Sequence, residues 1–369
     1  MALELLSPAG SPEALRAAVQ SGCGAVYLGW GSFNARRSAK NFSDEEFADA
    51  IRYCHLRGVR VFLTLNTLLT DRELPLALDA ARTACRLGVD SVLVQDWGLF
   101  ALLREALPDL PLHASTQMSV FTAGGANEVY GDGCERVVIA RECSAEDTRT
   151  ICENCPVEVE VFAHGALCMC YSGQCGMSAL IGGRSGNRGR CAQPCRLPYG
   201  VNAPAKKAYP LSLKDSCLAG RLEEMGAMGV SCVKLEGRMK RPEYVAAVTG
   251  IYAALLREHR APTADEQKKL ANEQLKIIAK EIDQCTELIA EKAKEVDAAK
   301  NKEERQLEKY RGRVRAMEEN GGYNILAVIL QANNFSELLT AFDDMGEIMS
   351  SDKTLQAQYV AAREQTEEV

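Results

Sequence analysis

The stretch that decides the fold stands at the start of the chain and reads LELLSPAGSPEALRAAVQSGCGAVYLG, residues 3–29. Short apolar runs at Leu3–Leu6 and Ala25–Leu28 predict two strands, and the segment Glu13–Gln20 between them predicts a helix. A strand, a helix and a second strand in this order form the unit from which parallel sheets are built. The opening of the chain therefore indicates an α/β protein.

The same alternation continues for about 260 residues. Six further apolar runs are predicted as strands, at Val59–Leu65, Ser91–Val94, Leu112–Ser115, Val137–Ile139, Val157–Phe162 and Val230–Leu235. Helices are predicted at Asp44–Arg57, Arg72–Leu87, Leu99–Ala106 and Pro242–Glu258. Eight strands with intervening helices favour a parallel sheet closed into a (β/α)₈ TIM-like barrel, and an open doubly wound sheet is the alternative. No GxGxxG motif opens the first helix, which disfavours dinucleotide binding.

Polar residues follow five of the predicted strands. They are Gln95 and Asp96, Thr116 and Gln117, Arg141 and Glu142, His164, and Glu236 with Arg238. In a barrel, the C-terminal ends of the strands form the face that carries chemistry. Any one of these residues is as readily a helix cap or a loop ion pair, so the set carries more weight than its members.

Composition separates the chain into two parts. The 369 residues are 47% hydrophobic and 25% charged, enough for one large domain and an additional element. The formal charge of -7 argues against a general nucleic-acid coat, and the 6% aromatic content argues against large stacking platforms. Residues 1–260 carry 28 Lys+Arg and 28 Asp+Glu, whereas the rest carries 15 against 22. We therefore predict a globular domain over 1–264 and a polar helical tail over 265–369.

Cysteine usage and the first residues indicate a compartment. The chain holds 15 cysteines but begins MALELLSPAG, with neither a basic nor a long apolar leader. No run of 18 apolar residues occurs, so we predict no membrane span and a cytoplasmic location. Thiols stay reduced there, and a dense group of cysteines then more often indicates metal or redox chemistry than disulfides.

Such a group lies in a long insertion before the last predicted strand, at about 164–229. Its cysteines include Cys168, Cys175, Cys191 and Cys195, spaced C-x6-C, then fifteen residues, then C-x3-C. The many glycines nearby let backbone amides approach sulfur atoms, as an iron–sulfur cluster requires. A structural zinc site would be expected to show paired CxxC motifs. The spacing thus favours an iron–sulfur cluster, with zinc or free buried thiols as alternatives.

Charge gives a second indication about the same part of the chain. Residues 181–241 contain 12 Lys+Arg and 4 Asp+Glu. A basic patch suits RNA or another phosphate-bearing partner, and an ordinary solvated surface is the alternative. RNA-binding surfaces commonly add aromatic side chains, but only Tyr199 and Tyr209 stand in this segment, so the indication is weak.

The tail has a different pattern. Between residues 268 and 317, apolar residues recur at three- and four-residue spacing with one phase slip. This pattern is typical of a coiled coil and predicts self-association through the tail.

Several long motifs identify the first part of the chain. EVFAHGALCMCYSGQC, NRGRCAQPCR, LSLKDSC and VKLEGRMKRPEY resemble the signatures of peptidase family U-32, the collagenase-like peptidases, as do SPAGSPEALRAAVQSGCGAVYLG and FNARRSAKNFS upstream. The resemblance extends from about Leu3 to about Ala264. The tail from about 268 to 369 resembles the coiled-coil region of peptidoglycan hydrolase regulators.

The resemblance implies more than one activity. Some members of the family are labelled peptidases or collagenases. Others resemble enzymes that hydroxylate pyrimidines of tRNA or ribosomal RNA, or that assist ubiquinone hydroxylation without oxygen; these are linked to a 4Fe-4S cluster and to prephenate. By its motifs, the resemblance implies that Cys168, Cys175 and Cys191 are ligands of the cluster. It implies Cys217 as the fourth ligand. Cys195 and Cys232 compete with Cys217 for that place.

The residues favour the hydroxylation branch over the peptidase label. Neither GxSxG nor HExxH occurs, and the four histidines are scattered. We predict Glu160, His164 and Arg141 as catalytic residues at the barrel mouth. The substrate-binding residues are predicted to be Arg36, Gln117, Glu236 and Arg238. The leading hypothesis is an iron–sulfur enzyme of RNA hydroxylation type that uses a small carboxylate co-substrate such as prephenate. A protease and a non-catalytic scaffold acting through the tail are the alternatives.

Overall fold

A computed structural model gives the structure of the chain. It describes residues 3–36, 40–172, 174–199 and 209–271, together with 294–305, 307–309, 311–312, 315, 350, 353–354, 356–358 and 360. The chain forms two compact units, Met1–Gln274 and Leu275–Val369, and each is described by itself.

Eight parallel strands close into a barrel in the first unit. They are β1 (Glu4–Ala9), β2 (Ala25–Leu28), β3 (Arg60–Leu65), β4 (Ser91–Val94), β5 (Leu112–Ala114), β6 (Arg136–Val138), β7 (Glu158–Gly165) and β9 (Cys232–Leu235). Neighbouring strands from β1 through β7 pair in parallel, from β1 with β2 to β6 with β7. Strand β9 pairs in parallel with both β7 and β1. The sheet therefore has no free edge among these strands, and the predicted TIM-like barrel is confirmed.

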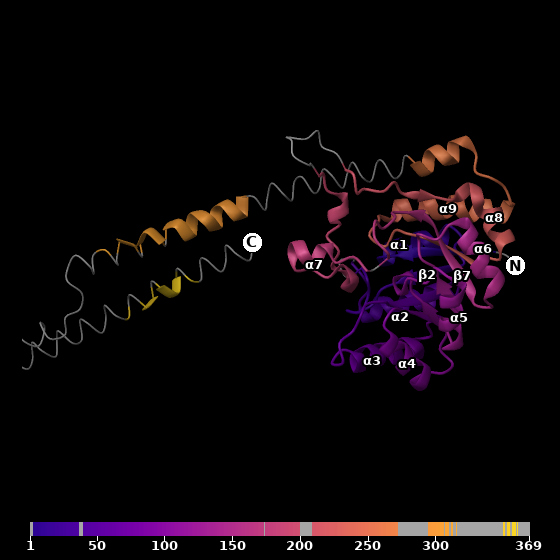
Figure 1. The fold of residues 1–369 in the computed structure, drawn as a ribbon, viewed down its shortest axis with the longest axis horizontal. Helices are drawn as coiled ribbons and strands as arrows, with labels where there is room; N and C mark the ends of the chain where they lie inside the picture. Colours follow the sequence, from indigo (N-terminus) through magenta and orange to yellow (C-terminus); the bar gives the residue numbers. More distant parts are fainter. Residues whose placement is uncertain are drawn as a thin grey trace, which may run out of the picture. The chain divides into compact units, whose positions relative to one another are not determined.

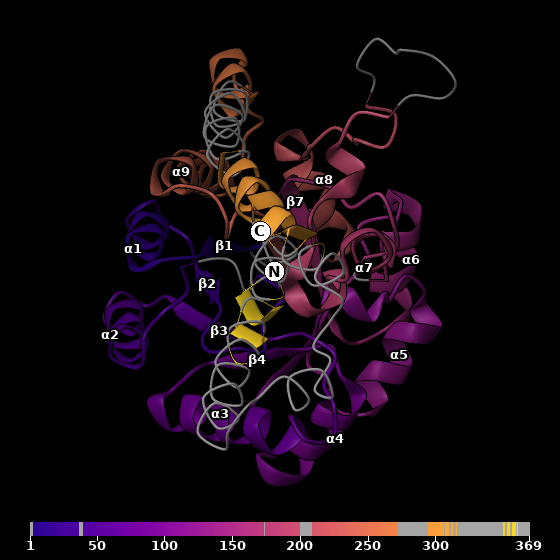
Figure 2. The same ribbon diagram turned by 90° about the vertical axis from the view of Figure 1, so that its left-hand side faces the viewer.

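A ring of helices surrounds the strands, as Figure 2 shows. The ring comprises α1 (Pro12–Gln20), α2 (Asp44–His55), α3 (Leu74–Leu87), α4 (Trp97–Ala106), α5 (Ala123–Gly131), α6 (Ala145–Asn154), α8 (Leu222–Met228) and α9 (Pro242–Glu258). The sequence analysis predicts no helix at α5 or α6, because the first is glycine-rich and the second is mostly polar, so neither carries a strong apolar stripe.

Local sequence signals fix several helix ends. Ser11 caps α1 by accepting a hydrogen bond from the amide of Ala14. At α2, Ser43 and Glu46 bond reciprocally to each other's backbone amides and form a capping box. Gly88 ends α3 in the left-handed conformation at φ 96°. These signals begin and end the helices at the loops that join them to the strands.

The insertion between β7 and β9 has its own small elements. It contains α7 (Met177–Gly182), the short turns η2 (Gly186–Arg190), η3 (Pro194–Arg196) and η4 (Ala219–Arg221), and the two-residue strand β8 (Ser216–Cys217). Unlike the barrel strands, β8 pairs antiparallel with the end of β7. Figures 1 and 2 show α7 at one end of the barrel, outside the ring of helices. We call residues 166–199 the cysteine loop.

The barrel interior combines an apolar cluster with charges that are buried at Arg136, Glu160 and Lys234 and half exposed at Arg60 and Glu158. Leu6, Tyr27, Phe62, Leu93 and Val138 are among the residues that form the apolar cluster. Beside them lies an ionic network of six residues, which we call the interior network: Glu4, Arg60, Arg136, Glu158, Glu160 and Lys234. Because the network holds three cations and three carboxylates, its charges balance.

The tail is described only in part. Residues 264–271 and 294–305 are helical. Both ranges fall in or beside the part of the chain for which a helical tail is predicted. Most of the heptad pattern over 268–317 lies outside the described residues. In the part of the chain that the structure describes, no helix has both the length and the apolar character needed to span a bilayer.

Candidate functional site

A carboxylate surrounded by arginines lies at the C-terminal end of the barrel, which we call the mouth. Glu236 directly follows β9, and its carboxylate lies 2.7 Å from Nη2 of Arg141 and 3.4 Å from Nη2 of Arg36. Arg238, two residues along, is buried and donates to Oγ1 of Thr64 at 2.8 Å. We call Arg36, Arg141, Glu236 and Arg238 the arginine site.

Electrostatics at the arginine site leave positive charge in excess. Burial opposes the ionisation of Glu236, but the charges of Arg36, Arg141 and Arg238 outweigh it and lower the pKa of Glu236 to about 2. Burial, together with the repulsion from Arg36, lowers the pKa of Arg238 to about 10. Three cations surround one carboxylate that remains ionised, so the site carries a surplus of two positive charges at neutral pH.

Two glycines allow the loop after β9 to lie this close to its neighbours. A side chain at Gly10 would place its Cβ 1.8 Å from the carbonyl oxygen of Arg238. Gly165, at φ 104°, ends β7, and a Cβ there would lie 2.8 Å from the Cβ of Glu236. Substitution at either position would displace the loop that carries two members of the arginine site.

Amide side chains continue the polar rim beyond the arginines. Asn66 accepts a hydrogen bond from the amide of Ala35 at 3.1 Å and donates to Oγ of Ser115 at 3.2 Å. Gln95 donates to the backbone oxygen of Gln117 at 3.4 Å. The side-chain oxygens of both glutamines are buried and have no hydrogen-bond partner among the described residues. Gln117 thus lies at the mouth as predicted, with an acceptor available to a ligand.

Other rim residues have structural roles. Asp96 caps α4 through the amide of Leu99 and also accepts from the amide of Leu69. Thr116 donates to the backbone oxygen of Ile139. These contacts hold successive loops of the mouth together.

The structure corrects the expected position of Glu160. Its side chain is 0% exposed and lies within the barrel, where it pairs with Nζ of Lys234 at 2.8 Å and with Nη1 of Arg136 at 3.5 Å. It faces inward from the middle of β7, at the level of Val138 and Cys232 rather than at the mouth. Glu160 therefore belongs to the interior network, and the rings of Tyr27 and Phe162 lie between its partner Lys234 and the arginine site.

His164 also lies elsewhere than expected. The pairing of β7 with β9 shifts register between Phe162 and His164, and the imidazole contacts Tyr244 and Tyr252 of α9. A register shift of this kind redirects a side chain to the other face of a strand. Burial lowers the pKa of His164 to about 4, so the ring is neutral at neutral pH. The side chain packs between the barrel wall and α9 instead of entering the mouth.

Cysteines gather in the cysteine loop. The thiols of Cys168 and Cys175 are close enough to Cys170 to raise its pKa, although burial is the larger cause. Cys195 is affected in the same way by Cys168 and Cys191, again after burial. The backbone amide of Met177 donates to Sγ of Cys175, and that of Gln193 donates to Sγ of Cys191, each at 3.4 Å.

The two remaining candidates differ sharply from each other. Cys217 is exposed, stands in β8 opposite His164 and lies beside the hydroxyl of Tyr252. Cys232 is fully buried in the apolar cluster of the barrel. The interior position of Cys232 excludes it as a ligand of a cluster held by the cysteine loop, which leaves Cys217 and Cys195.

The cysteines of the loop are not arranged around a single metal ion. Among the described residues, no three His, Cys, Asp or Glu side chains converge as one metal ion would require. A tetrahedral zinc site would bring four thiolates to a single ion, whereas a four-iron cluster binds each thiolate through a separate iron and spaces the sulfurs more widely. The donor set, thiols of which two already accept hydrogen bonds from backbone amides, is chemically suited to hold an iron–sulfur cluster.

The cysteine loop is seated on the mouth. Gln174 donates to the backbone oxygen of Gln117 at 3.1 Å, and Oγ of Ser119 donates to the backbone oxygen of Ser172 at 3.3 Å. Arg141 donates to the backbone oxygen of Ala166 at 2.6 Å, so one side chain contacts both the loop and the arginine site. The candidate cluster ligands and the arginines thus share one face of the barrel.

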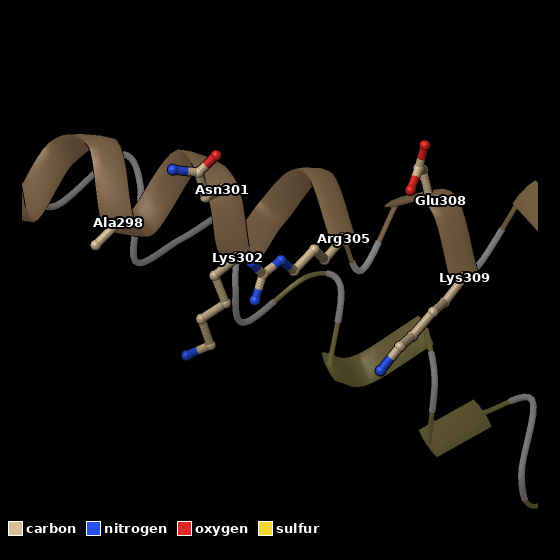
Figure 3. A pocket seen from close by; sticks show the side chains of 6 residues that line it. All are labelled: Ala298, Asn301, Lys302, Arg305, Glu308 and Lys309. Atoms are coloured by element: carbon tan, nitrogen blue, oxygen red, sulfur yellow. The ribbon is translucent and has the colours of Figure 1, made fainter.

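A hollow lies along a helix of the second unit. It is lined by Ala298, Asn301, Lys302, Arg305, Glu308 and Lys309, which Figure 3 shows along one helical stretch. All six side chains are exposed, so nothing there is desolvated enough to recognise a ligand.

Two family models match the chain, one over each part. The model of the family described as "Peptidase family U32" matches residues 10–297. A second model, described as the coiled-coil domain of the peptidoglycan hydrolase PcsB, matches residues 293–369.

Three curated relatives match the first part of the chain. A 23S rRNA 5-hydroxycytidine synthase of Escherichia coli is 39% identical over 259 residues, covering 69% of this chain and 39% of the relative. A tRNA hydroxylation protein of Bacillus subtilis is 34% identical, with coverage of 69% and 63%. A protein named collagenase from Porphyromonas gingivalis is 33% identical, with coverage of 72% and 68%. The chain thus spans less than two thirds of the length of the first two relatives.

Proposed function

The chain belongs to peptidase family U32, and on this premise we propose that it is an iron–sulfur enzyme of RNA hydroxylation type that uses a small carboxylate co-substrate. Relatives named for the hydroxylation of ribosomal RNA and of tRNA support the reaction class. The cluster, the co-substrate and the RNA are parts of the proposal. The described residues at the mouth supply its physical support.

The observation that carries the proposal is the surplus charge of the arginine site. Guanidinium groups bind carboxylates through paired, charge-assisted hydrogen bonds. A ligand with two carboxylates, such as prephenate, would neutralise the surplus of two positive charges. Nε of Arg141 is buried without a hydrogen-bond partner among the described residues, which leaves a donor for such a ligand.

Each member of the arginine site has a definable task. Arg36, which is half-buried, and Arg238 would bind the anionic groups of the co-substrate. Glu236 would hold Arg141 in place through the 2.7 Å ion pair. Because the surroundings are largely buried, these interactions would be stronger than in water.

The cysteine loop would hold the cluster beside this site. Cys168, Cys175 and Cys191 are the proposed ligands, with Cys217 as the fourth and Cys195 as its competitor. A bound cluster would supply one-electron redox chemistry at the mouth. The amides of Met177 and Gln193 would stabilise the thiolates that they already approach.

We also propose that the chain binds RNA and that it is located in the cytoplasm. The excess of basic residues over 181–241 suits a phosphate backbone. An enzyme that modifies tRNA or ribosomal RNA would work in the cytoplasm. Self-association through the coiled-coil tail also remains a proposal.

The peptidase alternative requires a histidine that activates a nucleophile, and the two histidines of the barrel strands are poorly placed for this task. The ring of His164 faces α9, and that of His113 is buried in the barrel, 3.3 Å from Oγ of Ser91. Burial holds the pKa of His113 well below its usual value. His164 stands opposite the exposed Cys217, but Cys217 is the proposed fourth ligand, and a thiolate that holds a cluster cannot also act as a nucleophile.

Iron analysis of the whole chain tests the proposal. After purification without oxygen we expect a brown protein with about four iron atoms per chain. Cys168→Ser should lower the iron content to near zero, while Cys85→Ser on α3 should leave it unchanged. A colourless protein, or equal iron in both variants, would overturn the cluster.

A further pair of variants identifies the fourth ligand. Cys217→Ser and Cys195→Ser are compared for iron content and for visible absorption. Loss in the first variant alone assigns Cys217, and loss in the second alone assigns Cys195. Far-ultraviolet circular dichroism of each variant confirms that the barrel still folds.

A further inference from the structure

Two aromatic rings stack on the surface at the mouth. Phe121 and Tyr171 have ring centroids 6.4 Å apart and an interplanar angle of 27°. Phe121 is 50% exposed and Tyr171 is 63% exposed, so much of both rings faces solvent. The pair thus presents a broad apolar surface that the core does not use.

The fold brings these rings together from separate parts of the chain. Phe121 stands immediately before α5, in the loop that follows β5, whereas Tyr171 belongs to the cysteine loop. The hydrogen bonds of Ser119 to Ser172 and of Gln174 to Gln117 join the two loops next to the pair. The rings are therefore held in position by backbone-anchored contacts.

Other exposed aromatics lack this arrangement. Trp97 packs edge-to-face against Phe100 of its own helix, which is buried. Tyr130, at 45% exposure, lies on α5 and forms no ring contact with the described residues. Single exposed aromatics are ordinary on protein surfaces, but a stacked pair beside a basic loop needs a reason.

Charge on the cysteine loop and at the mouth favours a polyanionic partner. Arg184 and Arg190 lie in the cysteine loop with exposed side chains, and neither forms an ion pair with the described residues. The arginine site adds its own surplus at the same mouth. Stacked rings on a face that also carries unpaired cations are a combination that binds single-stranded nucleic acid, since every base offers a face for stacking.

We propose that Phe121 and Tyr171 form a stacking platform for an unpaired base of single-stranded RNA at the barrel mouth. This inference rests on the proposed function and assigns its RNA-binding surface. Tyr171 stands between Cys170 and Cys175, so a base stacked on it lies beside the proposed cluster ligands. Low aromatic content argues against large platforms, but two rings suffice here because tertiary structure pairs them.

Binding of a fluorescent single-stranded oligoribonucleotide to the full chain tests the platform. Phe121→Ala and Tyr171→Ala should each weaken binding about tenfold, as measured by fluorescence anisotropy. Tyr171→Phe and Phe121→Tyr keep a ring and should bind like the unmodified chain. Tyr130→Ala removes an equally exposed ring away from the mouth and is the matched control.

The outcomes separate the platform from the enzyme. If both alanine variants bind the strand as tightly as the unmodified chain, the platform is overturned even when iron content and RNA hydroxylation persist. If the chain binds no single-stranded RNA, the platform is likewise overturned and the patch becomes a protein-binding surface. Ring-dependent RNA binding by a chain that holds no iron would support the platform while overturning the proposed function.

Discussion

The barrel contains two groups of charges that follow opposite rules. In the interior network, three cations meet three carboxylates, and Glu160 and Arg136 are 0% and 2% exposed. In the arginine site, three cations meet the single carboxylate of Glu236. Balanced buried charge is what a protein needs to remain folded, whereas unbalanced charge is retained where a ligand completes it. The comparison separates a structural network from a binding site within one barrel.

The largest expected effect is a loss of folding stability when a cation is removed from the balanced interior network. Arg136→Met would leave three carboxylates of the network with two cations, Lys234 and Arg60, and removal of one partner of a buried ion pair costs about 3–5 kcal/mol. We expect urea unfolding to report this loss. Arg238→Met, a matched change at the mouth, should alter the free energy of unfolding by less than about 1 kcal/mol, because it also removes a cation repelled by Arg36. Equal losses in the two variants would contradict the distinction.

Acid titration should reveal the charge on Glu236. Its pKa is about 2 in the folded chain, against an ordinary value of 4.5. A lowered pKa contributes stability that is present above about pH 4.5 and is lost as pH falls towards 2, and at about 1.4 kcal/mol per pH unit the total is roughly 3 kcal/mol. The stability difference between the unmodified chain and Glu236→Gln should therefore shrink by that amount over this range. A difference independent of pH would show that Glu236 is not ionised by the arginines.

The smallest effect concerns affinity. Arg238→Met should weaken prephenate binding about tenfold or more, measured by titration calorimetry, because a charge-assisted hydrogen bond contributes about 1.5–3 kcal/mol. Arg257→Met, on the exposed face of α9, removes the same charge away from the mouth and should not change binding. Equal prephenate affinity in both variants would contradict the proposal that the arginine site binds a carboxylate co-substrate.

Periodicity predicted the barrel well because its strands are short apolar runs with clear ends. The limits of β2 and β4 were predicted to the residue, Ala25–Leu28 and Ser91–Val94. Strand β8 was missed because two residues carry no periodic pattern, and its pairing with β7 depends on the folded insertion. Local pattern therefore finds elements that repeat and misses those defined by a distant partner.

The candidate site was predicted in part. Arg141, Glu236 and Arg238 come together at the mouth, as their places after strands imply, and Arg36 joins them from the loop after β2. His164 was expected there because it follows the predicted end of β7, but a register shift that no sequence pattern announces turns it towards α9. Glu160 was misplaced because alternation along a strand does not tell depth within a barrel.

The pairing of Phe121 with Tyr171 was also beyond the sequence, since fifty residues separate them. Only the fold shows that a loop after β5 meets the cysteine loop. The signal that could have found it is the position of Phe121 in a βα loop, where functional residues concentrate.

The antiparallel pairing of β8 with β7 has an evolutionary consequence. The insertion leaves the barrel at Gly165 and returns beside that residue at Ser216, so both of its attachment points lie on one strand end. A segment joined in this way can be lengthened, shortened or exchanged as a unit without disturbing the hydrogen bonds that close the barrel. The insertion can thus differ in length independently of the rest of the fold, at little cost to the closure of the barrel.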